Sequence, residues 1–311
     1  MQKCAQILKN ADKIALLPHI KPDGDTLGSA FALCAALGKM GKMCYVVTDY
    51  DIVGKLAVLL ENNDYHTKDC GGFETAVAID TADRALLGRC DAAFPKIDLS
   101  IDHHKSNKNF AAYTWMDVMA AATGELVYDL INELGVEIDE YIARALYIAI
   151  STDTGCFRYA NTTARTFLIA SHISGMFTGR DKLNLSLFSQ KSKRKIELEG
   201  YAAGKMRFFE DDKIALILLD SRSLEGVSED DFEGISQIGV SVEGVEVGIV
   251  ARQQDETEWR ISMRSNEYVD VSAICVFFGG GGHSRASGCT VIGDIEETVQ
   301  KMIEMIKERI K

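Results

Sequence analysis

The chain has 311 residues, of which 47% are hydrophobic, 26% are charged and three are proline, a composition that excludes a disordered chain and allows two domains with cores. The net charge is −12, and residues 205–311 alone carry 21 acidic against 12 basic side chains. Because proteins that follow a long polyanion present a basic face, this charge excludes long duplex nucleic acid as a partner and favours a small anionic ligand.

No apolar run reaches the ~20 residues of a membrane span, and the N-terminus lacks the features of a signal peptide. We therefore expect a cytoplasmic protein that does not bind a membrane. Its eight cysteines are never closer than ten residues apart, so no C-x-x-C zinc pair exists. We expect reduced cysteines that pack in the core.

Strand-like and helix-like segments alternate in the first part of the chain. Short apolar runs predict strands over residues 13–19, 43–49, 74–80 and 97–102. Helical spacing predicts helices over residues 26–38, 122–135, 139–153 and 163–177. This alternation is typical of βαβ units, so we expect an α/β domain with a mainly parallel sheet flanked by helices, over residues 1–185.

The pattern changes after this domain. The cationic stretch QKSKRK (190–195) opens a helical segment, which we interpret as part of a solvated helical linker over 186–204 rather than a phosphate site. Residues 205–311 predict a smaller C-terminal α/β domain. Its predicted elements are hairpins over 205–220 and 245–265, and helices over 270–278 and 295–310.

Acidic and imidazole side chains gather where the predicted strands and helices end. They are His19, Asp23, Asp25, Asp80, Asp102, His103, His104 and Asp153. The carboxyl ends of parallel strands are where such sheets bind ligands, so we expect these groups at one edge. Each motif alone has a simpler interpretation, as a turn or a helix N-cap. Their joint occurrence favours divalent cations, and Mn²⁺ or similar ions suit carboxylate and imidazole ligands.

A second candidate site is the stretch FFGGGGHSRASG (277–288). Four glycines let backbone N–H groups approach an anion, and His283 and Arg285 add charged donors. We interpret it as a phosphate-binding loop between a helix and a strand, with a flexible joining loop as the alternative. Arg264, in the predicted strand WRISMRS, is a weaker candidate.

The motifs HIKPDGD, VAID, IDHH and STDTG, in this order, resemble those of the DHH phosphoesterase superfamily. SMRS and GGGGHSRASG resemble the DHHA1 domain that follows it in such proteins. The length is similar to that of the stand-alone nano-RNase and pAp-phosphatase branch. Members of that branch cleave very short oligoribonucleotides and 3′-phosphoadenosine 5′-phosphate (pAp). The resemblance implies an active site in the cleft between the DHH and DHHA1 domains.

The resemblance also implies a role for each candidate residue. His19 and Asp23 would hold one Mn²⁺, while Asp25, His103 and Asp153 would hold a second and Asp80 would bridge the two; Mg²⁺ or Co²⁺ are alternatives. Asp102 would orient the neighbouring metal ligand, and His104 would face the substrate phosphate. The implied substrate-binding residues are Arg264, Ser265, Gly280, Gly281, Gly282 and His283, with Arg285 and Arg158 as further candidates.

The function implied by this resemblance is hydrolysis of oligoribonucleotides of about 2–5 nucleotides to mononucleotides, or of pAp to AMP, by two-metal activation of a water. The nearest alternative is a pApA phosphodiesterase of cyclic-dinucleotide turnover. A manganese inorganic pyrophosphatase is more distant, because the GGGGH loop belongs to the nucleotide-binding type of second domain. A non-catalytic nucleotide sensor would have lost metal ligands, and all six are present. The main substrate, the cleavage polarity, the physiological metal and a homodimeric state stay open.

Overall fold

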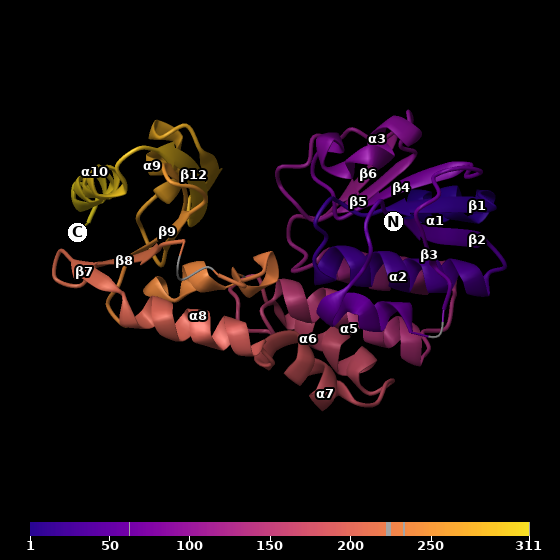
Figure 1. The fold of residues 1–311 in the computed structure, drawn as a ribbon. Helices are drawn as coiled ribbons and strands as arrows, with labels where there is room; N and C mark the ends of the chain where they lie inside the picture. The colour runs from indigo at the N-terminus through magenta and orange to yellow at the C-terminus, as the bar shows by residue number, and fades with distance from the viewer. Residues whose placement is uncertain (62, 222–224, 233, 311) are drawn as a thin grey trace. The chain divides into compact units, whose positions relative to one another are not determined.

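The computed structural model describes residues 1–61, 63–221, 225–232 and 234–310 (Figure 1). It divides the chain into two compact units, Met1–Gln190 and Lys191–Lys311, each with its own α/β fold as the sequence predicts. Helix α8 (Lys193–Gly204) lies within the predicted linker, and its Leu198 and Ala202 pack in a core cluster of the second unit. The domain limits expected at residues 185 and 205 stay predictions. Among the described helices, none has the length and apolar character to cross a membrane.

Six described strands of the first unit form one parallel sheet in the order β3–β2–β1–β4–β5–β6. This confirms the predicted parallel sheet. The chain order reverses between β1 and β4, and such a switch point is where open α/β sheets bind ligands at their carboxyl edge. The strands are β1 (Lys13–Leu17), β2 (Met43–Val47), β3 (His66–Thr67), β4 (Thr75–Ile79), β5 (Leu99–Asp102) and β6 (Tyr113–Met116).

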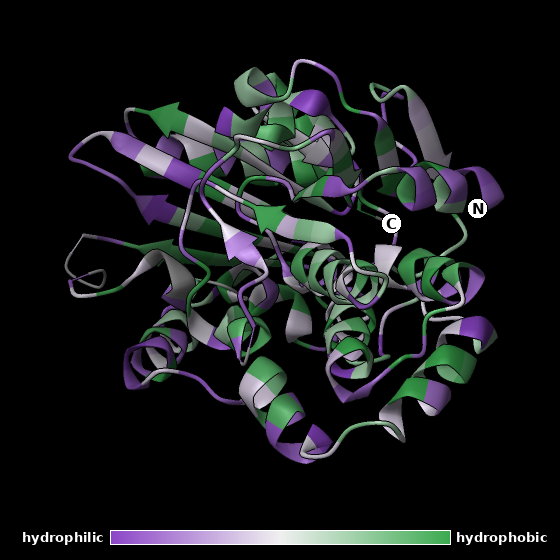
Figure 2. Cartoon of the chain, turned by 90° about the vertical axis from the view of Figure 1, so that its right-hand side faces the viewer, coloured by the Kyte–Doolittle hydropathy of each residue, from purple (hydrophilic) through white to green (hydrophobic). Residues whose placement is uncertain are grey.

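Helix α2 (Gly24–Lys39) is buried along nearly its whole length and packs in the same core cluster as α5 (Glu140–Asp153) and the sheet. Gly28 permits a close approach of α2 to α5, because a Cβ there would lie 2.5 Å from the Ala145 carbonyl oxygen. Figure 2 shows the hydrophobic and hydrophilic stretches that alternate along the helices. The other helices of this unit are α1 (Gln2–Asn10), α3 (Arg89–Ala93), α4 (Thr123–Leu134), α6 (Ala164–Ser174) and α7 (Arg180–Asn184).

The second unit has a mixed sheet in the order β11–β12–β10–β9–β8–β7. Only the β8/β9 pair is parallel among its described pairs. Helices α9 (Val271–Phe277) and α10 (Ile295–Lys307) pack with Trp259, Ile261 and Met263 of β10, so the residues between these face the other side. The strands are β7 (Arg207–Phe209), β8 (Ile214–Leu219), β9 (Val247–Gln253), β10 (Glu258–Ser265), β11 (Gly281–His283) and β12 (Ala286–Ile292).

The glycine-rich stretch differs from the expected loop. Gly281–His283 form strand β11, which pairs with Ala286, Ser287 and Gly288 of β12 to make a hairpin. Four successive glycines carry no strand propensity, so this pairing comes from the neighbouring strand and not from the segment itself. All eight cysteines are free; six are buried, as predicted for core residues, whereas Cys70 and Cys156 are half-buried.

Candidate metal centre

Segments that are far apart in the sequence bring acidic and imidazole side chains together in the first unit. Their donor atoms form three trios, and within each trio these atoms lie within 4.8 Å of one another. The trios are His19, Asp23 and Asp80; Asp25, His103 and Asp153; and Asp80, His103 and His104. All six residues predicted as metal ligands therefore belong to these clusters.

The N-terminus of α2 supplies two of the carboxylates. Asp23 caps α2, since its Oδ1 accepts the N–H of Thr26 at 3.0 Å. Asp25 lies in the first turn and is only 1% exposed. It accepts the backbone N–H groups of Thr123 (2.7 Å) and Gly124 (2.9 Å) from the first turn of α4. The positive end of a helix stabilises a buried carboxylate, so α4 supports the charge of Asp25.

Asp80 follows β4 in the left-handed backbone conformation, with φ of +54°, which aspartate tolerates better than most residues. Its side chain is 2% exposed. The hydroxyl of Thr26 donates to Oδ2 at 2.7 Å, and the hydroxyl of Thr123 donates to Oδ1 at 2.9 Å. Each carboxylate oxygen thus accepts one hydrogen bond and keeps a lone pair for a further partner.

His19 and His103 are each oriented by a backbone carbonyl. Nδ1 of His103 donates to the Ala120 carbonyl at 3.2 Å, and Nδ1 of His19 donates to the Ile20 carbonyl at 2.8 Å. Nε2 of His103 then lies 3.7–3.8 Å from carboxylate oxygens of three aspartates, and Nε2 of His19 lies 3.9 Å from Asp80. A histidine that donates through one ring nitrogen and offers the other is typical of metal ligands.

The carboxylates of the cluster repel one another. Burial, with the nearby charges of Asp80, Asp153 and Asp23, raises the pKa of Asp25 well above its usual range. Burial also raises the pKa of Asp80 and, opposed by His103, that of Asp153 to about 6. Ionised carboxylates are unfavourable in a buried site, and bound cations offset this unfavourable free energy. This donor set therefore fits divalent metal ions.

Asp102 and His104 form a hydrogen-bonded pair, in which His104 also belongs to the trio with Asp80 and His103. Nδ1 of His104 donates to Asp102 Oδ1 at 2.8 Å, and Asn107 donates to the other oxygen at 2.6 Å. The hydrogen bond that His104 donates to Asp102 raises the pKa of His104 to about 9. Asp102 bonds to His104 and Asn107, whereas the ring of His103 bonds to the Ala120 carbonyl, and the role predicted for Asp102 beside a metal ligand stays a prediction.

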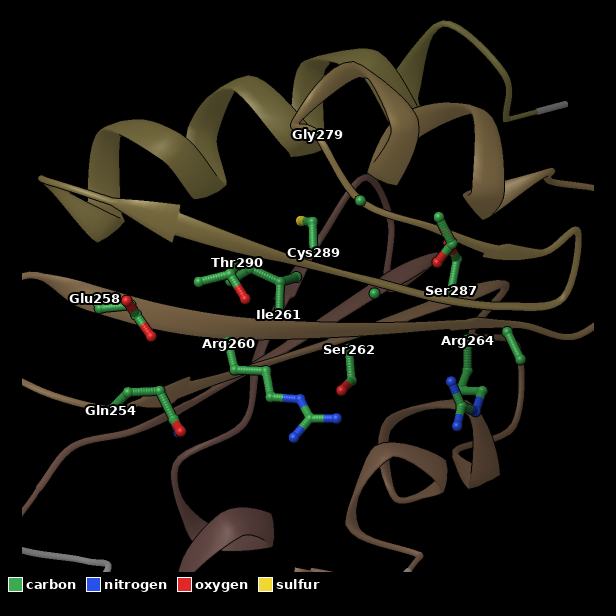
Figure 3. Close-up of a pocket in the computed structure, with 14 residues that line it drawn as sticks. Gln254, Glu258, Arg260, Ile261, Ser262, Arg264, Gly279, Ser287, Cys289 and Thr290 are labelled. Carbon is green, nitrogen blue, oxygen red and sulfur yellow. The ribbon is translucent and has the colours of Figure 1, made fainter. Parts of the chain in front are cut away.

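The second unit has a groove of about 740 Å³ over β10, β11 and β12 (Figure 3). Arg260, Ser262 and Arg264 point to the same side of β10, as alternate residues of a strand must (Figure 3). Gly280, Gly281 and Arg264, three of the predicted substrate-binding residues, line the groove, and their binding role stays a prediction. The groove is therefore polar, since two arginines and the acidic Glu258 line it, and glycine backbone forms part of its wall.

The other predicted substrate-binding residues do not line this groove. The hydroxyl of Ser265 donates to the Val269 carbonyl at 2.7 Å on the opposite face of β10, and Arg285 donates to the same carbonyl at 2.9 Å. Gly282 and His283 lie further along β11 and are exposed. Arg158 belongs to the first unit, where it donates to the Gly155 carbonyl at 2.7 Å.

The sequence did not indicate four further residues of these sites. Thr26 and Thr123 bond to Asp80, Asn107 bonds to Asp102, and Arg260 lines the groove. Buried threonines and asparagines are common, and no spacing marked them. Arg260 could have been found, because it stands four residues before Arg264 in the same strand and so shares its face.

Comparison with known proteins assigns this chain to a family. The DHH family, N-terminal domain, matches residues 13–150, and the DHHA1 domain matches residues 221–311. The bifunctional oligoribonuclease and PAP phosphatase NrnA of Thermus thermophilus is 30% identical over 100% of this chain and 94% of that protein. The chain belongs to the DHH family. This DHH protein is also 26% identical to the probable bifunctional oligoribonuclease and PAP phosphatase NrnA of Streptococcus mutans, over 96% of this chain and 97% of that protein.

The fold agrees with this assignment. An exopolyphosphatase-related protein from Bacteroides fragilis is similar in structure, with a TM-score of 0.88 and 25% identity over 97% of this chain and 94% of that one. As a DHH phosphoesterase, the protein is a hydrolase of phosphate esters that depends on metal ions, and the clustered aspartates and histidines are its candidate metal site.

Proposed function

We propose that this DHH phosphoesterase hydrolyses oligoribonucleotides of about 2–5 nucleotides to mononucleotides, and pAp to AMP, with two Mn²⁺ ions. The observation that carries the proposal is the assembly of the two trios, His19–Asp23–Asp80 and Asp25–His103–Asp153, in one unit. Two relatives that align along nearly the whole chain are named as oligoribonuclease and PAP phosphatase. The net charge of −12 also favours a small anionic substrate over a long strand.

Each trio would hold one ion, with Asp80 shared between them. Carboxylate and imidazole donors suit Mn²⁺ as well as related divalent ions. When bound, such ions lower the pKa of a water molecule to ~7 and neutralise phosphate charge. The raised pKa values of Asp25, Asp80 and Asp153 support this assignment, since unbalanced carboxylates require a compensating charge.

His104 and Asp102 would act on the substrate side. With its pKa near 9, His104 is protonated at neutral pH and can donate a charge-assisted hydrogen bond to a phosphate oxygen. Asp102 holds the ring through Nδ1, which leaves Nε2–H as the donor. Asn107 in turn fixes Asp102, so the orientation of His104 is set by buried groups.

The groove of the second unit would bind the far end of the substrate. Arg264 is half-buried, and its guanidinium can pair with a phosphate or carboxylate in two-point geometry. Gly281 has open space where a side chain would be, so its backbone can approach an anion closely. In this proposal the first unit carries the chemistry and the second unit selects the ligand.

A comparison of substrates tests the proposal. We would measure turnover with Mn²⁺ on pApA, a five-nucleotide RNA, a twenty-four-nucleotide RNA, pAp and inorganic pyrophosphate. Release of mononucleotide from the five-nucleotide RNA and of phosphate from pAp, with the long RNA almost untouched, is the expected result. Cleavage of pApA alone would favour the dinucleotide phosphodiesterase, and cleavage of pyrophosphate alone would contradict the proposal.

A further inference from the structure

Thr123 contacts two candidate metal ligands at once. Its backbone N–H donates to Asp25 Oδ2 at 2.7 Å, and its side-chain hydroxyl donates to Asp80 Oδ1 at 2.9 Å. Asp25 and Asp80 belong to different trios, so one residue at the start of α4 links both proposed ion sites. We propose that Thr123 is a positioning residue that fixes the carboxylate of Asp80, which would serve both ions. This inference rests on the proposed two-ion function.

The place of Thr123 is fixed by close packing of helices. Its side chain is fully buried. At the next residue, Gly124, an added Cβ would lie 2.7 Å from the Cβ of Ala149 in α5. The N-terminus of α4 therefore lies directly against α5 and cannot shift toward it. Gly124 also donates its N–H to Asp25 at 2.9 Å, so the first turn of α4 meets the carboxylate through two consecutive backbone groups.

Each oxygen of the Asp80 carboxylate accepts a hydrogen bond from one threonine hydroxyl. Thr123 donates to Oδ1, and Thr26, in the first turn of α2, donates to Oδ2 at 2.7 Å. One hydrogen bond on each oxygen leaves each with a lone pair and prevents the carboxylate from rotating. A carboxylate that is fixed in this way is suited to the bridging role proposed for Asp80. Loss of one hydroxyl would free the carboxylate to rotate and would weaken that role.

The threonine hydroxyl therefore has a defined effect on metal binding. Removing a group that orients a metal ligand typically lowers metal affinity about 10–100-fold. Thr123→Val keeps the shape of the side chain and the backbone N–H that donates to Asp25. It therefore removes the hydrogen bond to Asp80 alone. We expect the first Mn²⁺ to bind Thr123→Val as it binds the wild type, and the second to bind about 10–100-fold more weakly.

The test is a titration of the metal-free full-length protein with MnCl₂, in which electron paramagnetic resonance measures free Mn²⁺. Thr123→Ser, which keeps the hydroxyl, should bind both ions like the wild type. Thr81→Val is the matched control, since Thr81 is equally buried and adjoins Asp80, but its hydroxyl donates to the Ile79 carbonyl. It should also bind as the wild type does. If Thr123→Val does not fold, Thr123→Ala replaces it with the same expectation.

The outcomes separate this inference from the function on which it rests. Two Mn²⁺ ions bound to Thr123→Val with wild-type affinities, while the wild type binds two and hydrolyses its substrate, would overturn the role of Thr123 alone. Equal weakening in Thr123→Ser would also overturn it, because the hydroxyl would then be irrelevant. A wild type that binds fewer than two ions, or does not hydrolyse phosphate esters, would overturn both.

Discussion

His104 and Asp102 form an ion pair in which the partners differ strongly in exposure: the carboxylate is fully buried and the imidazole is 45% exposed, with 2.8 Å between Nδ1 and Oδ1. Burial alone would raise the pKa of Asp102, but the hydrogen bonds from His104 and Asn107 outweigh it and the pKa is lowered. The same hydrogen bond raises the pKa of His104 from 6.5 to about 9. The stabilisation from the histidine is complete below pH 6.5 and is lost as the pH rises through about 9.

The variant Asp102→Asn should shift the alkaline limb of the activity profile to lower pH. Without the carboxylate, the pKa of His104 returns toward 6.5, so most of its positive charge is lost at pH 8. We expect kcat at pH 8 to fall by about tenfold or more, with a smaller loss at pH 6. Measured pH profiles of kcat check this, with Asp12→Asn, at an exposed ion pair, as control. An unchanged alkaline limb would contradict the role of His104 as a cation.

The metal-free protein should become more stable as the pH falls from 8 to 5.5. A carboxyl group whose pKa is raised in the folded state destabilises that state when ionised, and the penalty disappears as the pH falls through the raised pKa. This applies to Asp25, to Asp80 and to Asp153, whose pKa is about 6. Thermal unfolding after chelation should show a rising Tm over this range. A Tm that is flat or falls would mean that the carboxylates do not repel one another as described.

With Mn²⁺ bound, the dependence on pH should reverse. Metal ligands must be deprotonated, so the increase in Tm on adding MnCl₂ should be large at pH 8 and small at pH 5.5. Asp153→Asn removes one ionised ligand, and it should raise the Tm of the metal-free protein at pH 8 while reducing the increase caused by MnCl₂. If Asp153→Asn kept the full increase, Asp153 would not be a ligand.

Arg264→Ala should raise KM for the five-nucleotide RNA more than it lowers kcat. The arginine lines the groove of the second unit, and the candidate metal ligands belong to the first. Loss of a charge-assisted hydrogen bond typically weakens binding by about 1.5–3 kcal/mol, which corresponds to about 10–150-fold in KM. Arg207→Ala, which removes an exposed ion pair with Glu296, is the control. An equal effect of both substitutions on KM would argue against the groove as the binding site.

Alanine at two neighbouring glycines should have different effects. A Cβ at Gly280 would lie 2.1 Å from the Gly288 carbonyl oxygen and 2.4 Å from the Cβ of Cys289, whereas a Cβ at Gly281 would meet nothing within 4 Å. Gly280→Ala should therefore lower Tm by several degrees, and Gly281→Ala should leave Tm unchanged but raise KM. Similar Tm values for the two variants would show that the hairpin relaxes around Gly280.

The sequence was sufficient to predict the elements that carry the metal site. Alternating strands and helices place Asp80 and Asp102 at strand ends, and the order of the strands then brings them to one edge. The contacts that orient these groups could not be predicted. Thr123 contacts Asp80 because α4, α2 and α5 pack closely at small residues. This contact depends on tertiary packing, and no periodic pattern in the sequence indicates it.

For the second unit, the sequence limited the prediction of binding residues in a different way. Arg264 and Ser265 are adjacent in β10, so the twofold period of a strand requires that they face opposite sides, and only the arginine lines the groove. The predicted strand was sufficient to show that Arg264 and Ser265 face opposite sides of the sheet. The hairpin at Gly281–His283 was not, because glycine has no side chain whose pattern could indicate a strand.

The most direct test of a two-ion phosphoesterase centred on Asp80 compares hydrolysis of the five-nucleotide RNA by the wild type and by Asp80→Asn, each with and without MnCl₂ after chelation. Asp80→Asn keeps the size of the side chain but removes the charge that is proposed to serve both ions. We expect the wild type to lose activity on chelation and regain it with MnCl₂, and Asp80→Asn to stay at least about 1,000-fold slower under all conditions. Substantial turnover by Asp80→Asn with Mn²⁺, or a wild type indifferent to chelation, would contradict the account.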